Sequence, residues 1–168
     1  MTIERAEPPL TASERDMLDG WLEYHRATLA WKCEGLSADQ LREPAVPPSS
    51  LSLLGLVRHM AEVERGWFRR RVGGADVSWL YCTADHLDGD FDDVADADVA
   101  EAFGTWRQEC DHARTIAAAV PSLDDTFEGN DGQTYSLRWI VSHMVEEYAR
   151  HNGHADLLRE RIDGARGD

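Results

Sequence analysis

The chain has 168 residues, of which 42% are hydrophobic, and its 32 acidic residues outweigh 17 basic ones to give a formal net charge of -15. The length suits one domain with a sizeable core, and the charge argues against nucleic acid or an anionic membrane surface as a partner, because both attract clustered Lys and Arg. No apolar run approaches the roughly 20 residues of a membrane span, and charged residues interrupt the N-terminus where a signal peptide would be apolar. We therefore expect a soluble, cytoplasmic protein that acts on a small molecule.

The N-terminal part of the chain predicts an irregular segment followed by a long helix. Residues 1–10 contain two adjacent prolines and are expected to form a flexible lead-in. An apolar helical period follows, and we expect the first helix to run from Thr11 to about Gly35, with Thr11 or Ser13 as its N-cap and the glycine as its stop. Residues 37–41 predict one short helical turn.

A second helix is expected from Ser49 to Phe68, after a proline-rich segment that stays extended. Its apolar stripe comprises Leu53, Leu56, Met60, Val63 and Trp67. Gly73-Gly74 is expected to end it. The acidic stretch from Asp85 to Asp98 has neither a helical period nor the Asp-x-Asp-x-Asp-Gly spacing of an EF-hand, so we expect a solvated loop rather than a calcium site.

A third helix is expected from about Asp98 to Val120, because apolar residues recur there with helical period and Pro121 closes the segment. Residues 124–135 are rich in turn-forming side chains and include the run Gly129-Asn-Asp-Gly132. This composition predicts turns and a small hairpin between the third helix and the last.

The last helix carries ionisable groups on a face that should be apolar. Ser136 as N-cap and Gly164 as stop predict one helix of roughly 27 residues. At about 100° per residue, one stripe collects Leu137, Ile140, Met144, Tyr148, Ala155, Leu158 and Ile162. His151 falls in the middle of this stripe and Glu147 on its edge one turn earlier, whereas Glu146 points toward solvent. Because an unpaired buried charge costs several kcal/mol, Glu147 and His151 need a partner, and a metal ion is one such partner.

These elements predict an all-α protein. Four long amphipathic helices without a convincing set of strands indicate a four-helix bundle. The connection between the second and third helices is long, which permits a topology other than simple up-and-down. We expect a single bundle domain over residues 11–164 and a short tail at residues 165–168.

Ligand sites in bundles are built from side chains on facing helices, so a third ligand should come from another helix. His59 is the best candidate, because it lies at the border of the apolar stripe of the second helix, and its neighbours Arg58 and Arg65 have a surface-like character. Two imidazoles and one carboxylate suit Zn²⁺ with an open coordination position, and the same set suits Fe²⁺ or Ni²⁺. The alternative is that the histidines are hydrogen-bonded core residues and that Glu147 pairs with Arg150 or Arg58.

The three cysteines are Cys33, Cys82 and Cys110. Their number is odd, their spacing is wide and they form no Cys-x-x-Cys pair, which fits reduced thiols better than a disulfide framework. None lies in a recognisable nucleophile setting, so we expect them to pack or to lie at the surface.

The segments His59–Phe68 and His143–Leu158 resemble the DinB/YfiT-like superfamily of metal-binding four-helix bundles, in particular an actinobacterial branch of unknown function. The resemblance extends from Thr11 to Gly164 and is most specific in the last helix. The superfamily's metal ligands are a histidine on the second helix and a pair four residues apart on the last. This pattern corresponds to His59, Glu147 and His151, and the glutamate version resembles the mycothiol-dependent maleylpyruvate isomerase.

The resemblance also directs attention to three further side chains. His154 stands where many relatives have glutamine and shares a face with Glu147, so it is a direct ligand, a support for a ligand or a pocket acid or base. His143, one turn before Glu147, is expected to line the mouth of the site or to hydrogen-bond the carboxylate. Glu62, one turn after His59, is expected to orient that histidine or a bound water, or to pair with a neighbouring arginine.

Several branches of the superfamily use low-molecular-weight thiols, so the resemblance implies a mycothiol-dependent transferase or isomerase whose metal activates the thiol sulfur, and a homodimer. The isomerase relatives usually carry an additional C-terminal domain, which we do not expect here, so the isomerisation itself is not supported. The alternative is a non-catalytic metal-binding or stress-related interaction protein. A di-iron ferritin-like site is disfavoured, because that class needs Glu-x-x-His on two helices and this chain has one Glu-x-x-x-His.

Overall fold

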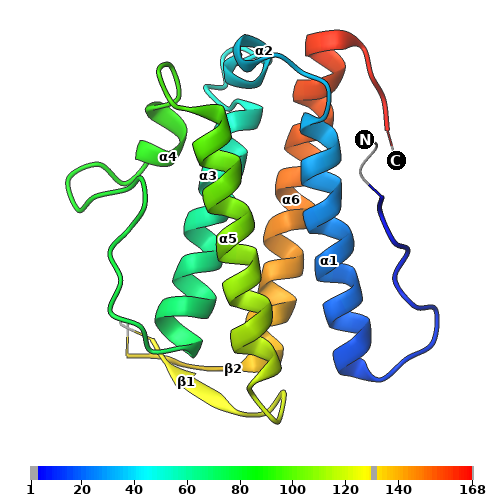
Figure 1. The fold of residues 1–168 in the computed structure, drawn as a ribbon, viewed down its shortest axis with the longest axis vertical. Helices are drawn as coiled ribbons and strands as arrows, with labels where there is room; N and C mark the ends of the chain where they lie inside the picture. The colour runs from blue at the N-terminus through cyan, green and yellow to red at the C-terminus, as the bar shows by residue number, and fades with distance from the viewer. Residues whose placement is uncertain (1–3, 130–131, 168) are drawn as a thin grey trace.

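The computed structural model describes residues 4–129 and 132–167. Its long helices are α1 (Glu14–Cys33), α3 (Leu53–Glu64) continued by η1 (Arg65–Val72), α5 (Val99–Ala118) and α6 (Leu137–Asp163). They lie side by side, with α1 against α6 and α3 against α5 (Figure 1). The predicted all-α class is therefore confirmed, and no helix in the described ranges is both long and apolar enough to cross a membrane.

Serine side chains cap the starts of α1, α2 (Ala38–Arg42), α3 and α6, and Asp98 caps α5. Ser136 accepts a hydrogen bond from Trp139 N, and Gly164 ends α6 in the left-handed conformation at φ 78, so both predicted ends of the last helix are confirmed. Ser13 rather than Thr11 caps α1, which therefore begins at Glu14 and ends at Cys33. The second helix begins at Leu53 and not at Ser49, because the Ser52 hydroxyl accepts from Gly55 N and fixes the first turn there. The short α2 matches the predicted turn.

The second helix also changes its winding after Glu64. The segment η1 is a π-helix, in which hydrogen bonds run from residue i+5 to residue i, and Gly73 N donates to Phe68 O at 2.8 Å in this pattern. The predicted glycine stop at Gly73-Gly74 is correct, since Gly74 has φ +63. No sequence pattern indicated the π-helix, because the apolar residues of this segment also fit an α-helix.

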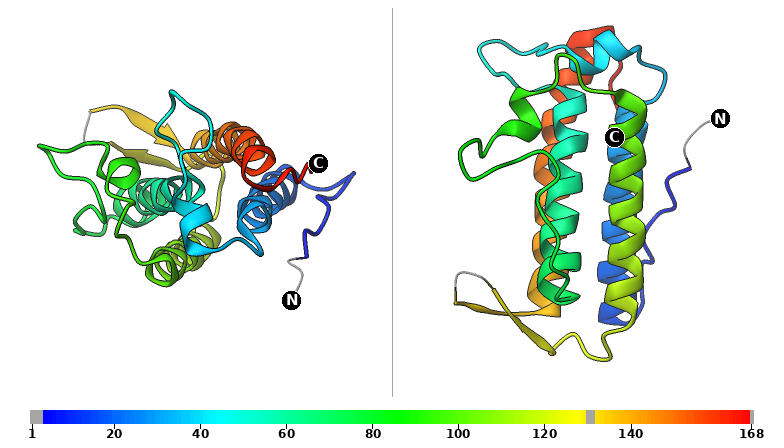
Figure 2. Two further views of the ribbon diagram at one scale, coloured as in Figure 1. Left: turned by 90° about the horizontal axis from the view of Figure 1, so that it is seen from above. Right: turned by 60° about the vertical axis from the view of Figure 1, so that its left-hand side comes forward.

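The acidic connection between η1 and α5 is not simply a solvated loop. It contains the short helix α4 (Gly89–Asp92), which packs against α3 (Figure 2). Arg58, expected at the surface, is buried and donates to the carbonyl oxygens of Gly89 and Asp90 at 2.9 and 3.0 Å. A Cβ at position 89 would lie 2.4 Å from Tyr81 O, so only glycine fits this close approach. The connection is therefore pinned to the side of α3 that carries His59.

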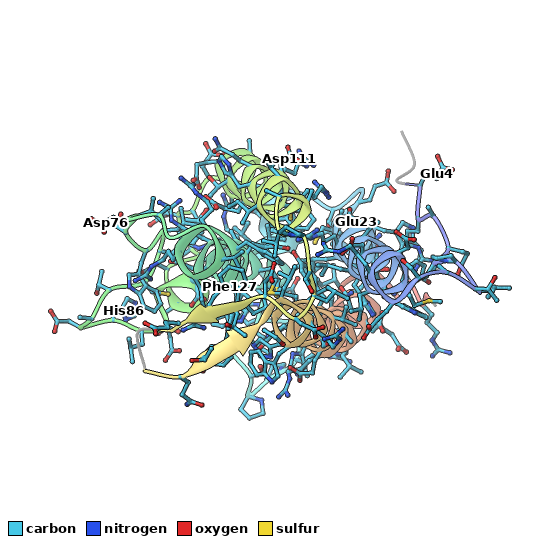
Figure 3. All side chains as sticks on the ribbon, turned by 90° about the horizontal axis from the view of Figure 1, so that it is seen from below. Glu4, Glu23, Asp76, His86, Asp111 and Phe127 are labelled. Atoms are coloured by element: carbon cyan, nitrogen blue, oxygen red, sulfur yellow. The ribbon has the colours of Figure 1, made fainter. Side chains whose placement is uncertain are left out.

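The predicted hairpin is present at the end of the molecule where α5 ends and α6 begins. Strand β1 (Thr126–Glu128) pairs antiparallel with β2 (Thr134–Ser136), and Phe127 lies opposite Tyr135. Seen along the helix axes, Phe127 lies across the end of the helices while Asp76 and Asp111 lie at the periphery (Figure 3). Asn130 and Asp131 of the predicted turn lie outside the described residues.

The core contains a polar network to which each long helix contributes. Glu64 is fully buried. Its carboxylate accepts hydrogen bonds from Nε and one Nη of Arg26, at 2.7 and 2.6 Å, and from the hydroxyl of Tyr148 at 2.8 Å. Trp106 Nε1 donates to that hydroxyl at 2.9 Å, and the thiol of Cys110 lies 3.6 Å from the carboxylate. Burial alone disfavours the charge of Arg26, but the carboxylate of Glu64 outweighs burial and raises the pKa of Arg26 above its ordinary value. The buried charges are thus paired across α1 and α3.

Candidate metal centre

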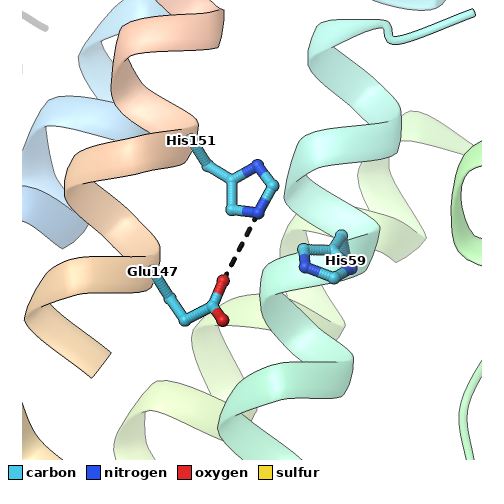
Figure 4. A group of neighbouring side chains, drawn as sticks. All are labelled: His59, Glu147 and His151. Atoms are coloured by element: carbon cyan, nitrogen blue, oxygen red, sulfur yellow. Dashed lines mark ion pairs between the residues drawn. The ribbon is translucent and has the colours of Figure 1, made fainter. Parts of the chain in front are cut away.

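The structure brings together the three side chains that the sequence selected. His59 projects from α3, and Glu147 and His151 project toward it from α6 (Figure 4). One ligand atom from each residue lies within 4.8 Å of the other two, and the two imidazole centroids are 4.7 Å apart. Nε2 of His151 is 3.5 Å from Oε2 of Glu147. The predicted apolar stripe of α6 is buried except at Ile162, which is half-buried, and Glu146 is exposed. The helical register therefore selected the correct glutamate to face α3.

Asp90, which the sequence analysis missed, supports His59. Its Oδ2 lies 2.8 Å from Nδ1 of His59, and its side chain is buried. The second carboxylate oxygen accepts from Phe91 N at 3.0 Å, and the Phe91 ring stacks on the imidazole at 4.7 Å. A carboxylate only accepts hydrogen bonds, so Nδ1 of His59 carries a proton, and Nε2 is the ring nitrogen left for a metal ion. A carboxylate behind a histidine in this way is typical of metal sites.

The imidazole of His151 is held in its neutral form. Burial is the main cause that lowers its pKa, to about 4, and the neighbouring imidazoles of His59 and His154 lower it further. Nδ1 of His151 is 3.4 Å from Nδ1 of His154, while Nε2 faces Glu147. At neutral pH His151 thus offers a lone pair that need not first lose a proton, as a metal ligand must.

The carboxylate of Glu147 lies between two histidines. Oε1 is 3.4 Å from Nε2 of His143, and Oε2 faces His151. The ring of His143 stacks on Trp139 at a centroid distance of 4.8 Å and lies 4.9 Å from Trp67. The alternative in which Glu147 pairs with an arginine is not what the structure shows, because Arg150 pairs with Glu146 and Arg58 holds backbone carbonyls.

The carboxylate of Glu62 accepts hydrogen bonds from backbone groups that the sequence did not suggest as partners. Its Oε1 accepts from the backbone N–H groups of Leu80, Tyr81 and Cys82, at 2.7, 2.6 and 3.0 Å. The alternative of an ion pair with Arg58 or Arg65 does not form, since Arg58 donates to the carbonyl oxygens of α4, and Arg65 donates to Ser78 O and to Glu109. This carboxylate therefore fixes the start of the acidic connection beside the site.

A sequence model of one protein family, described as mycothiol-S-transferase, matches residues 17–164. The chain belongs to this family. It is a DinB/YfiT-like family, so the resemblance seen in the sequence is confirmed. A comparison with the curated proteins found no match. The family assignment covers α1 to α6 and includes every residue of the candidate metal centre.

In this mycothiol S-transferase family member, a cavity of about 570 Å³ borders the candidate metal centre. Its lining includes His59 and Asp90, residues of η1 and residues of the acidic connection. Cys82 also lines it, and burial raises the pKa of its thiol to about 11, so this thiol stays protonated at neutral pH and is a poor nucleophile. The cysteine that lines the cavity is therefore poorly suited to act as a nucleophile there.

Asp90 provides a direct test of the site. We expect Asp90→Asn to weaken Zn²⁺ binding by about 10- to 100-fold. An uncharged amide raises the basicity of His59 as a metal ligand less than a carboxylate does. Affinity is measured by competition with a chromogenic chelator, and Asp92→Asn, at an exposed position of the same short helix, is the matched control. Equal affinities of the two variants and the wild type would show that Asp90 does not support a metal ligand.

Proposed function

We propose that the protein is a metal-dependent mycothiol S-transferase, in which His59, Glu147 and His151 hold a divalent ion at the edge of the cavity. The observation that carries the proposal is the convergence of two imidazoles and a carboxylate in a chain of this family, with Asp90 placed behind His59. Three ligands leave a coordination position open, which a catalytic metal needs. Nitrogen and oxygen ligands favour Zn²⁺, and Ni²⁺ and Fe²⁺ are the alternatives.

A bound divalent ion would supply charge that lowers the pKa of a thiol and holds it as the thiolate at neutral pH. Asp90 keeps the proton on Nδ1 of His59 and so directs Nε2 toward Glu147 and His151. His143 and His154 flank these residues, and their contacts support a role in holding Glu147 and His151 in place rather than as ligands. In the transfer, one S–C bond forms, the bond from that carbon to its leaving group breaks, and the thiol proton is released to solvent.

The proposal extends to the architecture and the setting. The long helices form a four-helix bundle of the DinB/YfiT type, as one domain over residues 11–164 between a flexible lead-in and a short tail. The protein works in the cytoplasm as a homodimer. The contacts of α1 with α6 and of α3 with α5 support the bundle, and the free thiols of Cys33, Cys82 and Cys110 support a reducing compartment.

The test uses cobalt in place of the native ion. Addition of mycothiol to the Co²⁺-loaded protein should produce a new sulfur-to-cobalt absorption, and the loaded protein should accelerate thioether formation between mycothiol and iodoacetamide above the uncatalysed rate. His151→Ala should show neither effect. If the wild type binds Co²⁺ without any change on addition of thiol and without acceleration, the protein is a metal-binding module and not a transferase.

A further inference from the structure

The cavity beside the metal centre has two rows of side chains from one continuous helix. His59, Val63, Trp67 and Arg71 recur every fourth residue, and Glu62, Gly66 and Arg70 form a parallel row. In a regular α-helix, residues four apart advance by about 40°, so the row from His59 to Arg71 would turn away by about 120°. In the structure all four residues line the same cavity, which shows that the row stays on one side of the helix.

The π-helix explains why this row stays aligned. A π-turn contains more residues than an α-turn, so residues four apart remain nearly in line through η1. The same winding directs Phe68 into the core, where it is fully buried. π-helical segments are frequent at functional sites, and η1 carries Trp67 and Arg71, which line the same cavity as His59.

The four arginines of η1 fall into two pairs. Arg65 and Arg69 both donate to Oε1 of Glu109 at 2.8 Å. Arg70 and Arg71 make no hydrogen bond or ion pair with any residue in the described ranges, and both line the cavity. In a chain with a net charge of -15, carboxylates are abundant, and most other arginine side chains donate to a carboxylate or carbonyl oxygen. The two cations in the cavity are left without such a partner.

Aromatic rings position these two side chains. The guanidinium carbon of Arg71 lies 4.2 Å from the ring centroid of Trp67 and 4.7 Å from that of Tyr135, and that of Arg70 lies 5.3 Å from the ring of Trp79. A guanidinium stacked on a ring keeps the N–H groups at its edge available, and their fork matches the two oxygens of a carboxylate. The stacking therefore holds each cation in place without using its donors.

The carboxylates of the cavity do not neutralise these cations. Glu62 accepts from three backbone N–H groups and Asp90 holds His59, so both are already engaged. Glu128 lies at the exposed rim and forms no ion pair with either arginine. The lining of the cavity thus combines His59 of the candidate metal centre with two arginines that have no ion-pair partner among the described residues.

We infer that Arg70 and Arg71 bind a carboxylate of the electrophilic substrate and so place its reactive carbon near the thiol sulfur. The substrate class is an organic acid that carries a carbon open to attack by sulfur. The inference rests on the proposed function for the reaction, but binding of the carboxylate itself requires neither metal nor thiol. That difference separates the two proposals experimentally.

The first arm of the test compares two electrophiles that differ in charge. Iodoacetate and iodoacetamide both form a thioether when sulfur bonds to the CH₂ carbon and iodide leaves with the electron pair of the C–I bond. With the metal-loaded protein and mycothiol, Arg70→Gln and Arg71→Gln should each raise the KM for iodoacetate about 10-fold and change that for iodoacetamide less than about twofold. Arg107→Gln is the matched control, because Arg107 also stacks on an aromatic ring, Phe103, but lies outside the cavity.

The second arm measures binding without catalysis. Benzoate and benzamide are titrated into the metal-free protein by calorimetry, and Arg71→Gln should weaken benzoate binding about 10-fold, while Arg107→Gln should not. If this pattern appears but no transfer occurs, the carboxylate site stands and the transferase proposal fails. The inference is overturned if benzoate binds the wild type and Arg71→Gln equally. It is also overturned if the variants raise the KM for iodoacetate and for iodoacetamide by the same factor.

Discussion

Replacement of Glu64 by glutamine will lower the free energy of unfolding by about 3–5 kcal/mol, the cost of leaving a buried charge without its partner. The carboxylate is inaccessible to solvent and receives two hydrogen bonds from Arg26 and one from Tyr148. In Glu64→Gln, Arg26 keeps only Glu23, whose side chain is 45% exposed and which already pairs with Arg114. Urea unfolding followed by circular dichroism measures the change.

An exposed ion pair serves as the control for this prediction. Glu146→Gln removes the partner of Arg150 on the solvent side of α6 and should cost less than about 1 kcal/mol. The double variant Arg26→Met/Glu64→Gln should be less destabilised than the sum of its single variants, because the orphaned charge is gone. Additive losses in the double variant would show that Arg26 and Glu64 are not energetically coupled.

Replacement of Glu147 by alanine will weaken metal binding by about 100-fold or more, a larger effect than the loss of an outer supporting carboxylate. Ligand atoms of Glu147, His59 and His151 lie within 4.8 Å of one another. The variant leaves two imidazoles and no anionic ligand to hold the metal ion. Elemental analysis of the purified protein should find about one metal ion per wild-type chain and far less than that in Glu147→Ala.

The adjacent glutamate is the control. Glu146→Ala changes the same residue type one position away, where the side chain is exposed and paired with Arg150. It should keep the wild-type metal content. Equal metal loss in both variants, or full retention in Glu147→Ala, would exclude the arrangement of ligands proposed here. Circular dichroism of each variant shows whether the fold is retained.

Local features of the sequence predicted much of the fold and part of the site. Serine caps, glycine stops and apolar periodicity act over one or two turns, so Ser136, Gly164 and the buried stripe of α6 could be identified without tertiary information. The same periodicity separated Glu147 from Glu146, because 100° between neighbours places them on different faces. Helix starts were less certain, since Thr11 and Ser13 are both capable caps and only packing selects one.

Distant contacts decided the remaining features. Asp90 lies 31 residues from His59, in a run of similar acidic residues, and no local signal distinguishes it from its neighbours. Arg58 looked like a surface residue because its charge suggested exposure, but the carbonyl oxygens of α4 satisfy it when buried. These positions depend on how the acidic connection folds back on α3, which the spacing of residues within α3 does not determine.

The sequence by itself determined the helical class, the ends of α6 and the face on which Glu147 and His151 lie, because these follow from backbone geometry within a single helix. Only the tertiary structure placed Asp90 behind His59 and paired Glu64 with Arg26. It also revealed the π-helix that turns Arg71 toward the cavity. Each of these depends on long-range packing, which selects among local conformations and partners that the sequence leaves nearly equal in energy.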